Sequence, residues 1–499
     1  MVRTLLLAFL LTSVPGVLLG QLSGNNLMEY QLGNLPHTEP AALSSHYDQL
    51  NLAYTNKGLR ASVRYEHFFS QLEESSYYRM SQFRVRYRTG KLELKVGNFN
   101  ETLGNGLLVR GFEIPGSVFE EEGYRSRYGF YRDMLGVAVK YSGDIWYLKA
   151  LRGKSLVNSL PPTRPPEERR VDLVEGMETG VRFHGQSLGI ILMRNSNPFE
   201  SELFYSMLGK GTIGSLLNWD FEYAHDVNSD QSFIAMEEDA RYGLYAASSL
   251  VLGSFGLSAE YKRYHNLFIG SGISDPPTVV REQKYKVLNR SIHVPLLDDE
   301  AGFQLEAYYS FPGRQHLVLN YTRAVNRLFR LSRFNELFAE FSFYAGEANG
   351  LTLFADFSSD EFKGEDWRYS SGAIWEHSLG GSWSFQVHGE YQYIEREIIE
   401  KTSLHNGVLS LGVSQSPRMS VSLLWETSTD PRLTDLPATV PVGNGVRHWP
   451  GVNLSWRINK SNTLSLFAGK RRGGPACTSG ICYEVLDFEG VEIRLKTKF

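Results

Sequence analysis

The carboxy-terminal segment of the chain, Val491 to Phe499, alternates without a break between apolar or small residues and charged ones. Successive side chains of a β-strand point to opposite faces, so a strand here has one apolar face and one charged face. The first face carries Val491, Ile493, Leu495, Thr497 and Phe499, and the second carries Glu492, Arg494, Lys496 and Lys498. One face suits lipid and the other suits water, so the segment predicts a strand at a boundary between the two.

The same alternation recurs through the chain and is punctuated by turn-forming residues. It is clear in the segments 59–66, 91–96, 303–309 and 385–391. Beyond the amino-terminal segment, no stretch approaches the roughly 18 consecutive apolar residues of a transmembrane helix. In hydrocarbon, strands are stable only in a closed barrel, which leaves no unpaired edge. A soluble β-sandwich also alternates, but its polar faces seldom carry so many charges. The pattern therefore predicts an all-β fold, a large antiparallel transmembrane β-barrel.

The amino-terminal segment 1–20 has the composition of a secretory signal peptide. A basic residue, Arg3, precedes an apolar run from Leu5 to Leu11, and small and turn-forming residues follow as far as Gly20. This order is typical of exported proteins, and cleavage is expected after Gly20. The barrel is then expected to span 21–499. Strands begin almost at once, so no separate plug domain is expected ahead of it.

The connections between the expected strands alternate between short and long. Short turns are expected at 56–58, 89–90, 209–211, 253–254, 312–313, 380–381 and 459–461, among others. Outer-membrane barrels have short periplasmic turns and long extracellular loops, with an even strand number that leaves both termini in the periplasm. An even number here requires a strand at 25–32 ahead of the one at 47–55. The expected total is roughly 24 strands, within about 22 to 26.

A barrel of this size encloses a wide lumen, roughly 45 Å across. An empty lumen of that width would be a leak, so long outer loops are expected to fold inward. The candidates are the segments 99–133, 152–170, 267–300 and 426–450. In the first, the glycine-rich run 103–111 allows close backbone approach and is interpreted as a bulge or a packed inward turn rather than as a dinucleotide site.

The third of these loops has the most distinctive local sequence, from Asp275 to His293. Thr278 follows two prolines and is predicted to cap a short helix. The packing residues of that helix are predicted to be Val280, Val287 and Leu288. Two interpretations remain open: a lid that constricts the lumen, or an ordered outer loop held by ion pairs. The candidate constriction residues are Arg281, Glu282, Asn289, Arg290 and His293.

Charged residues on the expected inward faces of the strands form a second group of candidates. The lumen-lining candidates are Arg60, Arg64, Glu66, Arg84, Arg86, Arg88, Lys91, Glu93, Lys95, Glu306, Glu340 and Glu390. A basic ladder on the early strands would favour anionic solutes. An internal ion-pair network that seals the barrel explains the same residues and is the preferred interpretation. Acidic clusters at 120–122, 298–300 and 360–361 lack calcium-loop spacing and are interpreted as solvated outer loops.

The only cysteines, Cys477 and Cys482, lie close together in the connection before the last strand. Exported proteins meet oxidising conditions, so a disulfide between them is expected. It is expected to rigidify an outer loop and to present Arg471 and Arg472 to a surface partner or to lipopolysaccharide phosphate. A solvated loop is the alternative for these arginines.

Three stretches, 96–111, 275–293 and 471–482, resemble predicted outer-membrane β-barrels of Bacteroidota and related bacteria, an uncharacterised family. The last strand, which closes on Phe499, resembles the terminal signal by which bacterial outer-membrane barrels are recognised for insertion. These resemblances imply the outer membrane of a Gram-negative bacterium. They bring no catalytic residues.

The sequence contains no motif of serine hydrolases, zinc proteases or phosphate-binding loops, and no paired Cys-x-x-Cys motif. We therefore predict no catalytic residues, cofactor or metal site. A net charge of −4 gives no reason to expect a nucleic-acid partner. The expected function is a channel or transporter gated by its own loops, in contact with outer-membrane lipid and the barrel-assembly machinery. The alternatives are a platform that docks an envelope-protein partner and, less favoured, an outer-membrane enzyme.

Overall fold

The computed structural model describes residues 20–229, 234, 240–271, 273–294, 296–327, 331–398, 400–430, 445–478 and 481–499. Apart from Gly20, the expected signal peptide lies outside the described residues. The same is true of most of the predicted inward loop at 426–450.

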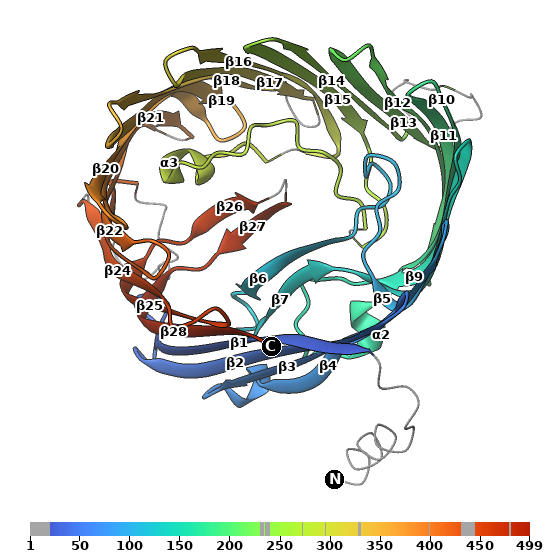
Figure 1. Ribbon diagram of the computed structural model, residues 1–499, viewed down its shortest axis with the longest axis horizontal. Coiled ribbons are helices and arrows are strands. Elements are labelled where there is room, and N and C mark those ends of the chain that lie inside the picture. Colours follow the sequence, from blue (N-terminus) through green and yellow to red (C-terminus); the bar gives the residue numbers. More distant parts are fainter. Residues whose placement is uncertain are drawn as a thin grey trace.

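A single closed antiparallel sheet of 24 strands forms the wall of the molecule (Figure 1). The wall strands are β1 (Gln21–Asn34), β2 (Leu43–Asn56), β3 (Leu59–Ser70), β4 (Tyr77–Thr89), β5 (Leu92–Phe99), β8 (Met134–Ser142), β9 (Trp146–Ser155), β10 (Leu173–Phe183), β11 (Gln186–Ser196), β12 (Ser201–Ile213), β13 (Leu217–Asp226), β14 (Tyr242–Leu252), β15 (Phe255–His265), β16 (Asp299–Phe311), β17 (Gln315–Asn326), β18 (Ser332–Ala345), β19 (Asn349–Asp360), β20 (Glu365–Gly380), β21 (Trp383–Glu397), β22 (Lys401–Gln415), β23 (Met419–Ser428), β24 (Arg447–Arg457), β25 (Asn462–Arg471) and β28 (Phe488–Lys498). The predicted fold class and strand number are confirmed.

The wall closes where the first strand pairs with the last. The register of β1 and β28 runs from Asn25 opposite Lys498 to Asn34 opposite Glu489. The strand predicted at 25–32 is therefore present, and it is longer than predicted. Because β1 starts and β28 ends at the same end of the barrel, this end is the periplasmic one under the rule for outer-membrane barrels.

Of the elements that the structure describes, two hairpins and two short helices lie inside the ring (Figure 1). One hairpin is β6 (Phe112–Glu120) with β7 (Arg127–Arg132), and the other is β26 (Gly474–Thr478) with β27 (Ile481–Val485). The helices are α2 (Pro166–Arg169) and α3 (Lys286–Asn289). A 3₁₀ turn, η1 (Glu73–Ser75), connects β3 and β4.

One predicted turn is wrong. The run 209–211 continues β12, which ends at Ile213, so the turn comes later. A Cβ on Gly209 would lie 2.9 Å from the ring of Trp219 on the neighbouring strand β13. The glycine therefore makes room for a large cross-strand side chain. A glycine in the sequence fits this role as well as it fits a turn, so composition alone does not separate the two.

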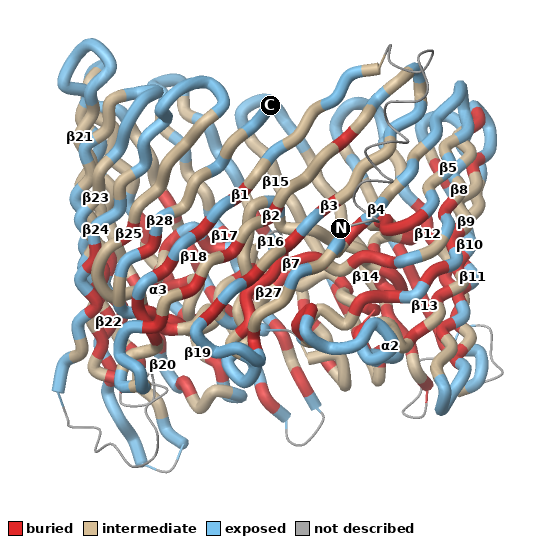
Figure 2. Tube along the Cα trace, turned by 90° about the horizontal axis from the view of Figure 1, so that it is seen from below, coloured by how far each residue is buried: buried red, intermediate tan, exposed pale blue. Residues whose placement is uncertain are grey.

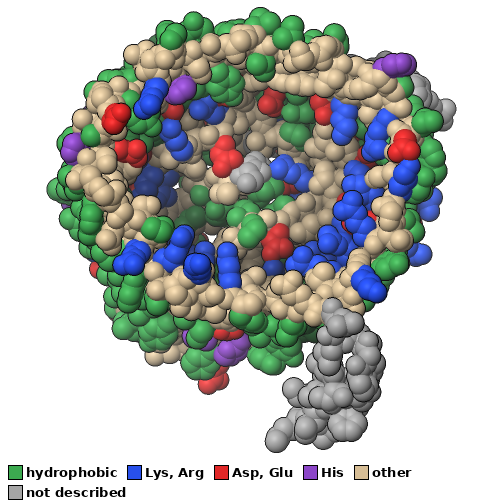
Figure 3. All heavy atoms as spheres, in the orientation of Figure 1, with side chains coloured by type: hydrophobic (Ala, Val, Ile, Leu, Met, Phe, Trp, Pro, Cys, Tyr) green, Lys and Arg blue, Asp and Glu red, His purple; other side chains and the backbone are tan. Residues whose placement is uncertain are grey.

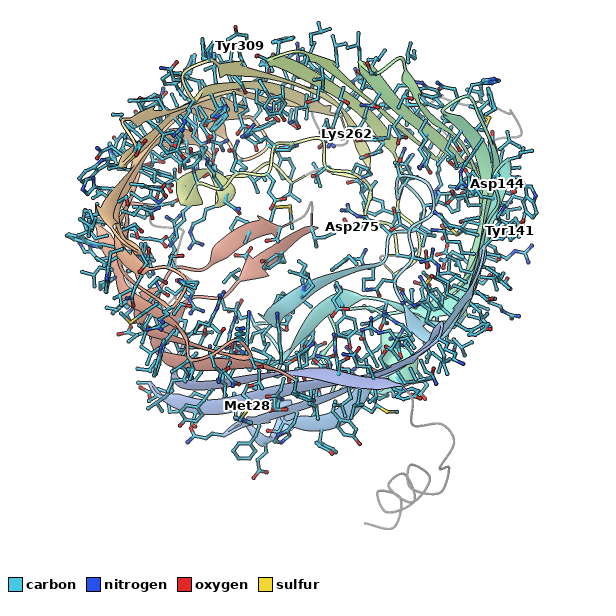
Figure 4. All side chains as sticks on the ribbon, viewed as in Figure 1. Met28, Tyr141, Asp144, Lys262, Asp275 and Tyr309 are labelled. Atoms are coloured by element: carbon cyan, nitrogen blue, oxygen red, sulfur yellow. A yellow bond between two sulfur atoms is a disulfide. The ribbon has the colours of Figure 1, made fainter. Side chains whose placement is uncertain are left out.

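The outer face of the wall is apolar and the inner face is polar. On β5, Leu92, Leu94 and Val96 are 36 to 42% exposed, while the intervening Lys95 forms an ion pair with Glu101 of an inner loop. Figure 3 shows hydrophobic side chains around the outside of the ring, and Lys, Arg, Asp and Glu around its opening. In Figure 4, Met28 and Tyr309 point away from the barrel, and Lys262 points into it.

A closed antiparallel barrel with an apolar outer face and a polar interior is the architecture that spans the bacterial outer membrane. The protein is therefore an integral outer-membrane β-barrel. Among the described residues, no helix is long and apolar enough to cross a membrane.

Candidate functional site in the barrel lumen

In the described part of the chain, four connections fold into the lumen: 100–133, 156–172, 266–298 and 472–487. All four leave the wall at the end opposite to the chain termini, which is the extracellular end. In Figure 2, α2, α3 and β27 lie in the half of the barrel away from the carboxy-terminus. The loops predicted to fold inward at 99–133, 152–170 and 267–300 do so. The last connection, predicted to be a surface loop, also lies inside.

The first inward loop packs its apolar residues against the wall. Leu103, Leu107, Leu108 and Val109 are fully buried in a cluster with wall residues such as Phe204. The backbone N–H groups of the glycine-rich turn donate to wall carboxylates, Gly104 to Glu178 at 3.0 Å and Asn105 to Glu222. A Cβ on Gly104, whose φ is +55°, would lie 2.4 Å from the carboxylate of Glu222. The run 103–111 is thus the packed inward turn that the sequence predicted.

The β6–β7 hairpin is attached to two of the lumen-lining candidates. Arg64 forms an ion pair of 2.5 Å with Glu113 of β6. Glu66 accepts hydrogen bonds from the N–H of Gly129 at 2.8 Å and from the hydroxyl of Tyr47 at 2.6 Å. Both wall residues are at least 90% buried. They hold the hairpin in place, and Arg64 also lines a cavity between the hairpin and the wall.

The third inward loop is held by an apolar cluster around α3. Tyr285, Val287 and Leu288 are buried together with Phe338 and Phe354 of the wall. The rings of Tyr285 and Phe354 stack with their centroids 3.7 Å apart. Val287 and Leu288 are therefore the packing residues that the sequence predicted.

The predicted helix start is wrong. The helix begins at Lys286 after Tyr285, with no side-chain cap, and Thr278 does not cap it. The segment before α3 is not helical and contacts the wall, where the hydroxyl of Tyr264 donates to the carbonyl of Pro277 at 2.7 Å. In this segment Val279 is buried, whereas Val280, which the sequence predicted as a packing residue, is only half-buried. Tertiary contacts with the wall thus replace the local capping that the prolines suggested.

The α3 loop meets a row of wall carboxylates that includes the predicted Glu306, Glu340 and Glu390. Arg281 pairs with Glu306 and lies 4.6 Å from the centre of the Phe338 ring. Glu340 binds Lys284 at 2.9 Å and accepts from the hydroxyl of Tyr285 at 2.7 Å. Glu390 accepts from the N–H groups of Lys286 and Val287 at 3.1 and 2.8 Å. Glu282 is exposed.

The α3 loop also contacts the β26–β27 hairpin. Arg290 donates to the carbonyl oxygens of Gly473 and Arg472, each at 2.7 Å. Its Nε lies 3.3 Å from Glu426 of the wall, which also binds Lys286 at 2.9 Å. The loop, the hairpin and the wall therefore share one set of polar contacts.

The predicted disulfide between Cys477 and Cys482 is present and joins the two strands of this hairpin. Its position differs from the prediction, because the hairpin lies in the lumen. Arg472 is 5% exposed and lies 5.6 Å from the Trp449 ring, and burial together with nearby Arg290 lowers its pKa to about 10. Arg471 pairs with Glu492 of the wall at 3.3 Å. Neither arginine is displayed on the surface as the sequence suggested.

His293 fixes the far end of the α3 loop to the wall. Its ring lies between Glu300 of β16, at 3.2 Å from Nε2, and Asp360 of β19, at 3.3 Å from Nδ1. The ring also stacks on Phe334, with centroids 4.5 Å apart. Burial lowers the pKa of His293, but hydrogen bonds to the two carboxylates outweigh it and raise the pKa above the ordinary value. The proton on this ring therefore strengthens the attachment.

The remaining lumen-lining candidates lie on β3, β4 and β5 and in the turn between β4 and β5. Some of their side chains form ion pairs and others do not. Lys95 pairs with Glu93 at 3.2 Å and with Glu101. Lys91 lies in the β4–β5 turn, not on the inward face, and pairs with Asp144 of another turn at 2.5 Å. Within the described residues, no ion pair involves the side chains of Arg60, Arg84, Arg86 or Arg88. Figure 3 shows Lys and Arg gathered along part of the inner rim.

Several residues that anchor the loops were not predicted. Glu29 of β1 binds Arg127 of the hairpin at 2.6 Å and Arg494 of β28. Glu300 is fully buried and binds Lys262 at 2.5 Å, so the cluster 298–300 is not a solvated loop. Asp360 is also buried. The inward position of Glu29 was readable from the alternation in β1, but its partners from distant segments were not.

No group of His, Cys, Asp and Glu side chains in the described part of the chain is arranged to hold a metal ion. The lumen is instead a set of ion pairs around loops at the extracellular end, with unpaired arginines towards the periplasmic end.

Comparison with protein families and with curated proteins finds no match to this chain. Solved structures do match. Pseudomonas aeruginosa OpdO is 15% identical, over 69% of this chain and 93% of its own, with a TM-score of 0.41. The translocation pore of the P pilus usher PapC is 11% identical, over 96% and 99% of the two chains, with a TM-score of 0.46. A BenF-like porin from Pseudomonas fluorescens Pf-5 is 10% identical, over 71% and 97%, with a TM-score of 0.36.

Proposed function

We propose that this protein is an outer-membrane channel whose passage is narrowed by its own inward loops and which admits a small hydrophilic solute. The observation that carries the proposal is the difference between the two ends of the lumen. The inward loops enter the lumen from the extracellular end, whereas the periplasmic end is lined by charged side chains such as Arg60 and Arg88, which are exposed.

The way the loops are attached supports a gate in preference to a permanent seal. The α3 loop meets the wall through a small apolar cluster and through carboxylates such as Glu340 and Glu390. The loop also pairs with wall carboxylates through Lys284 and Lys286, whose side chains are 57% and 40% exposed, and such exposed pairs are individually weak because water competes for both partners. A loop held in this way can exchange between attached and detached positions without disturbing the backbone hydrogen bonds of the wall.

Conductance of the purified protein in planar lipid bilayers tests the proposal. We expect a small conductance from the wild type and a larger one from the variant E340Q/E390Q, which weakens the contacts of Lys284 and of the α3 N–H groups. The matched control is E175Q, because Glu175 pairs with Arg152 away from the inward loops. The proposal fails if neither the wild type nor a folded variant lacking residues 276–290 conducts ions.

A further inference from the structure

A cavity of about 310 Å³ lies against the inner wall near the periplasmic end. Strands β1 to β4 form its outer side, and β6 closes it on the lumen side through Glu113, Pro115 and Gly116. It lies close to the β2–β3 turn, and its lining includes Arg60 and Arg84. This volume is at the lower end of the range for small-molecule sites.

The lining of this cavity carries more positive than negative charge. Three arginines, Arg60, Arg64 and Arg84, face one carboxylate, Glu113. The carboxylate of Glu113 forms an ion pair with the guanidinium of Arg64 at 2.5 Å. The Nε of Arg84 donates to the carbonyl oxygen of Asn98 at 2.6 Å, which fixes the side chain and does not neutralise it. Arg60 makes no side-chain hydrogen bond or ion pair within the described residues.

A fourth cation lies at the edge of the same cavity. The ammonium of Lys496 is next to Gly116, where an added Cβ would lie 3.2 Å from Nζ. No ion pair of Lys496 occurs within the described residues. Two arginines of the lining without an ion pair among the described residues, Arg60 and Arg84, thus lie near the ammonium of Lys496.

The positive charge continues from the cavity towards the periplasmic turns. Arg86 of β4 lies directly opposite Arg60 of β3 in the register of the sheet. The Nε of Arg86 is buried and has no hydrogen-bond partner. Arg88 follows two positions later on the same face, next to the β4–β5 turn. A line of guanidinium groups on one face of a wall attracts anions along it.

We propose that this cavity binds a small solute through a carboxylate or phosphate group, so that the channel proposed above selects for anions. Arginine suits this role, because its planar group donates two parallel hydrogen bonds to either oxyanion. Arg64, already held by Glu113 and Asn51, forms the fixed side of the site. Arg60 and Arg84 provide the charge that the solute neutralises.

Isothermal titration calorimetry of the purified protein in detergent tests the site without requiring transport. Succinate and glycerol 3-phosphate are the carboxylate and phosphate probes, and glycerol is the neutral comparator. We expect at least one of the two anions to bind, glycerol not to bind, and R60Q/R84Q to weaken the affinity at least tenfold. R60Q alone should weaken the affinity for the anion without affecting folding, because Arg60 has no side-chain partner among the described residues. R152Q is the matched control, since Arg152 pairs with Glu175 and its side chain is 70% exposed.

The proposal is overturned if neither anion binds, if glycerol binds equally well, or if R60Q/R84Q binds like the wild type while folded. These outcomes are separable from the channel proposal, which depends on conductance. If the protein conducts ions but binds neither anion, the channel proposal stands and the binding-site proposal fails. If the protein binds an anion but never conducts ions, the binding-site proposal stands and the channel proposal fails.

Discussion

Asn289 and Cys477 are joined by a pair of hydrogen bonds, although they lie in different inward loops. The backbone N–H of Cys477 donates to Oδ1 of Asn289 at 3.1 Å, and Nδ2 of Asn289 donates to the carbonyl oxygen of Cys477 at 3.4 Å. An asparagine side chain here continues the hydrogen bonding of the β26–β27 hairpin at its edge. The α3 loop and the hairpin therefore behave as one unit within the lumen.

The substitution Asn289→Ala should loosen this unit. It removes both hydrogen bonds, together with the one from Nδ2 to the carbonyl oxygen of Gln283 at 3.0 Å, and leaves the N–H of Cys477 without its partner, at a local cost of about 1–3 kcal/mol. We expect faster amide hydrogen exchange across Gly474–Thr478 and more frequent conductance openings, with the stability of the wall unchanged. Asn218→Ala is the control, because Asn218 donates to Ser249 at an exposed site between β13 and β14. Unchanged exchange in Asn289→Ala would show that the pair does not hold the hairpin.

Reduction of the disulfide should affect the hairpin and not the barrel. The bond between Cys477 and Cys482 closes a short loop and lies outside the 24-stranded wall. Loop-closure entropy is small for a short loop, so the stabilisation is confined to the hairpin. We expect C477S/C482S to unfold at nearly the wild-type temperature in detergent and to conduct more variably. A large loss of thermal stability would contradict this prediction.

The attachment at His293 should weaken as pH rises. The folded pKa of His293 is raised, so its contribution is fully present below the unfolded value, near 6.5, and is lost as pH rises through the folded pKa. Lys262 on Glu300 and Lys363 on Asp360 keep part of the charge balance when the ring is neutral. The loss is therefore a loosening of the attachment and not a release of the loop.

Conductance recorded between about pH 5.5 and 8.5 checks this, because histidine titrates in that range. We expect the wild type to conduct more at the upper end. In His293→Gln, which cannot take the charge, the difference should disappear. His316→Gln is the control, because His316 is exposed and contacts Ser310 near a periplasmic turn. A pH response that persists in His293→Gln would assign it to another group.

Much of the barrel was predictable, because lipid on one side and water on the other impose a period of two on every wall strand. The alternation in β5 and β28 marks which side chains face lipid. The presence of the closing strand β1 was predicted because an even number of strands required one more strand ahead of β2. The turn predicted at 209–211 is wrong because Gly209 makes room for the ring of Trp219 on the next strand. The local sequence does not encode this contact.

The lumen was less predictable, because its contacts join segments far apart in the chain. Glu390 was expected as a lining residue, but its role as the acceptor for the N–H groups of Lys286 and Val287 depends on where the α3 loop lies. The same applies to Glu300, whose neighbours in sequence resemble a solvated acidic loop. Sequence alternation indicates that such a residue faces inward, and only the fold shows what it meets there.

The terminal residue offers a test of how the barrel is assembled. The N–H of Phe499 donates to the carbonyl oxygen of Gly24 at 3.0 Å, and the N–H of Gly24 donates to Phe499 at 2.8 Å. Phe499→Ala keeps both backbone bonds and removes only the ring. If the ring serves as a signal to the barrel-assembly machinery, the variant should show less folded barrel in the outer membrane of cells, while refolding in detergent matches the wild type. Val491→Ala, on the same lipid-facing side of β28, is the control. Equal losses in cells and in detergent would instead make the ring a structural part of the closing pair.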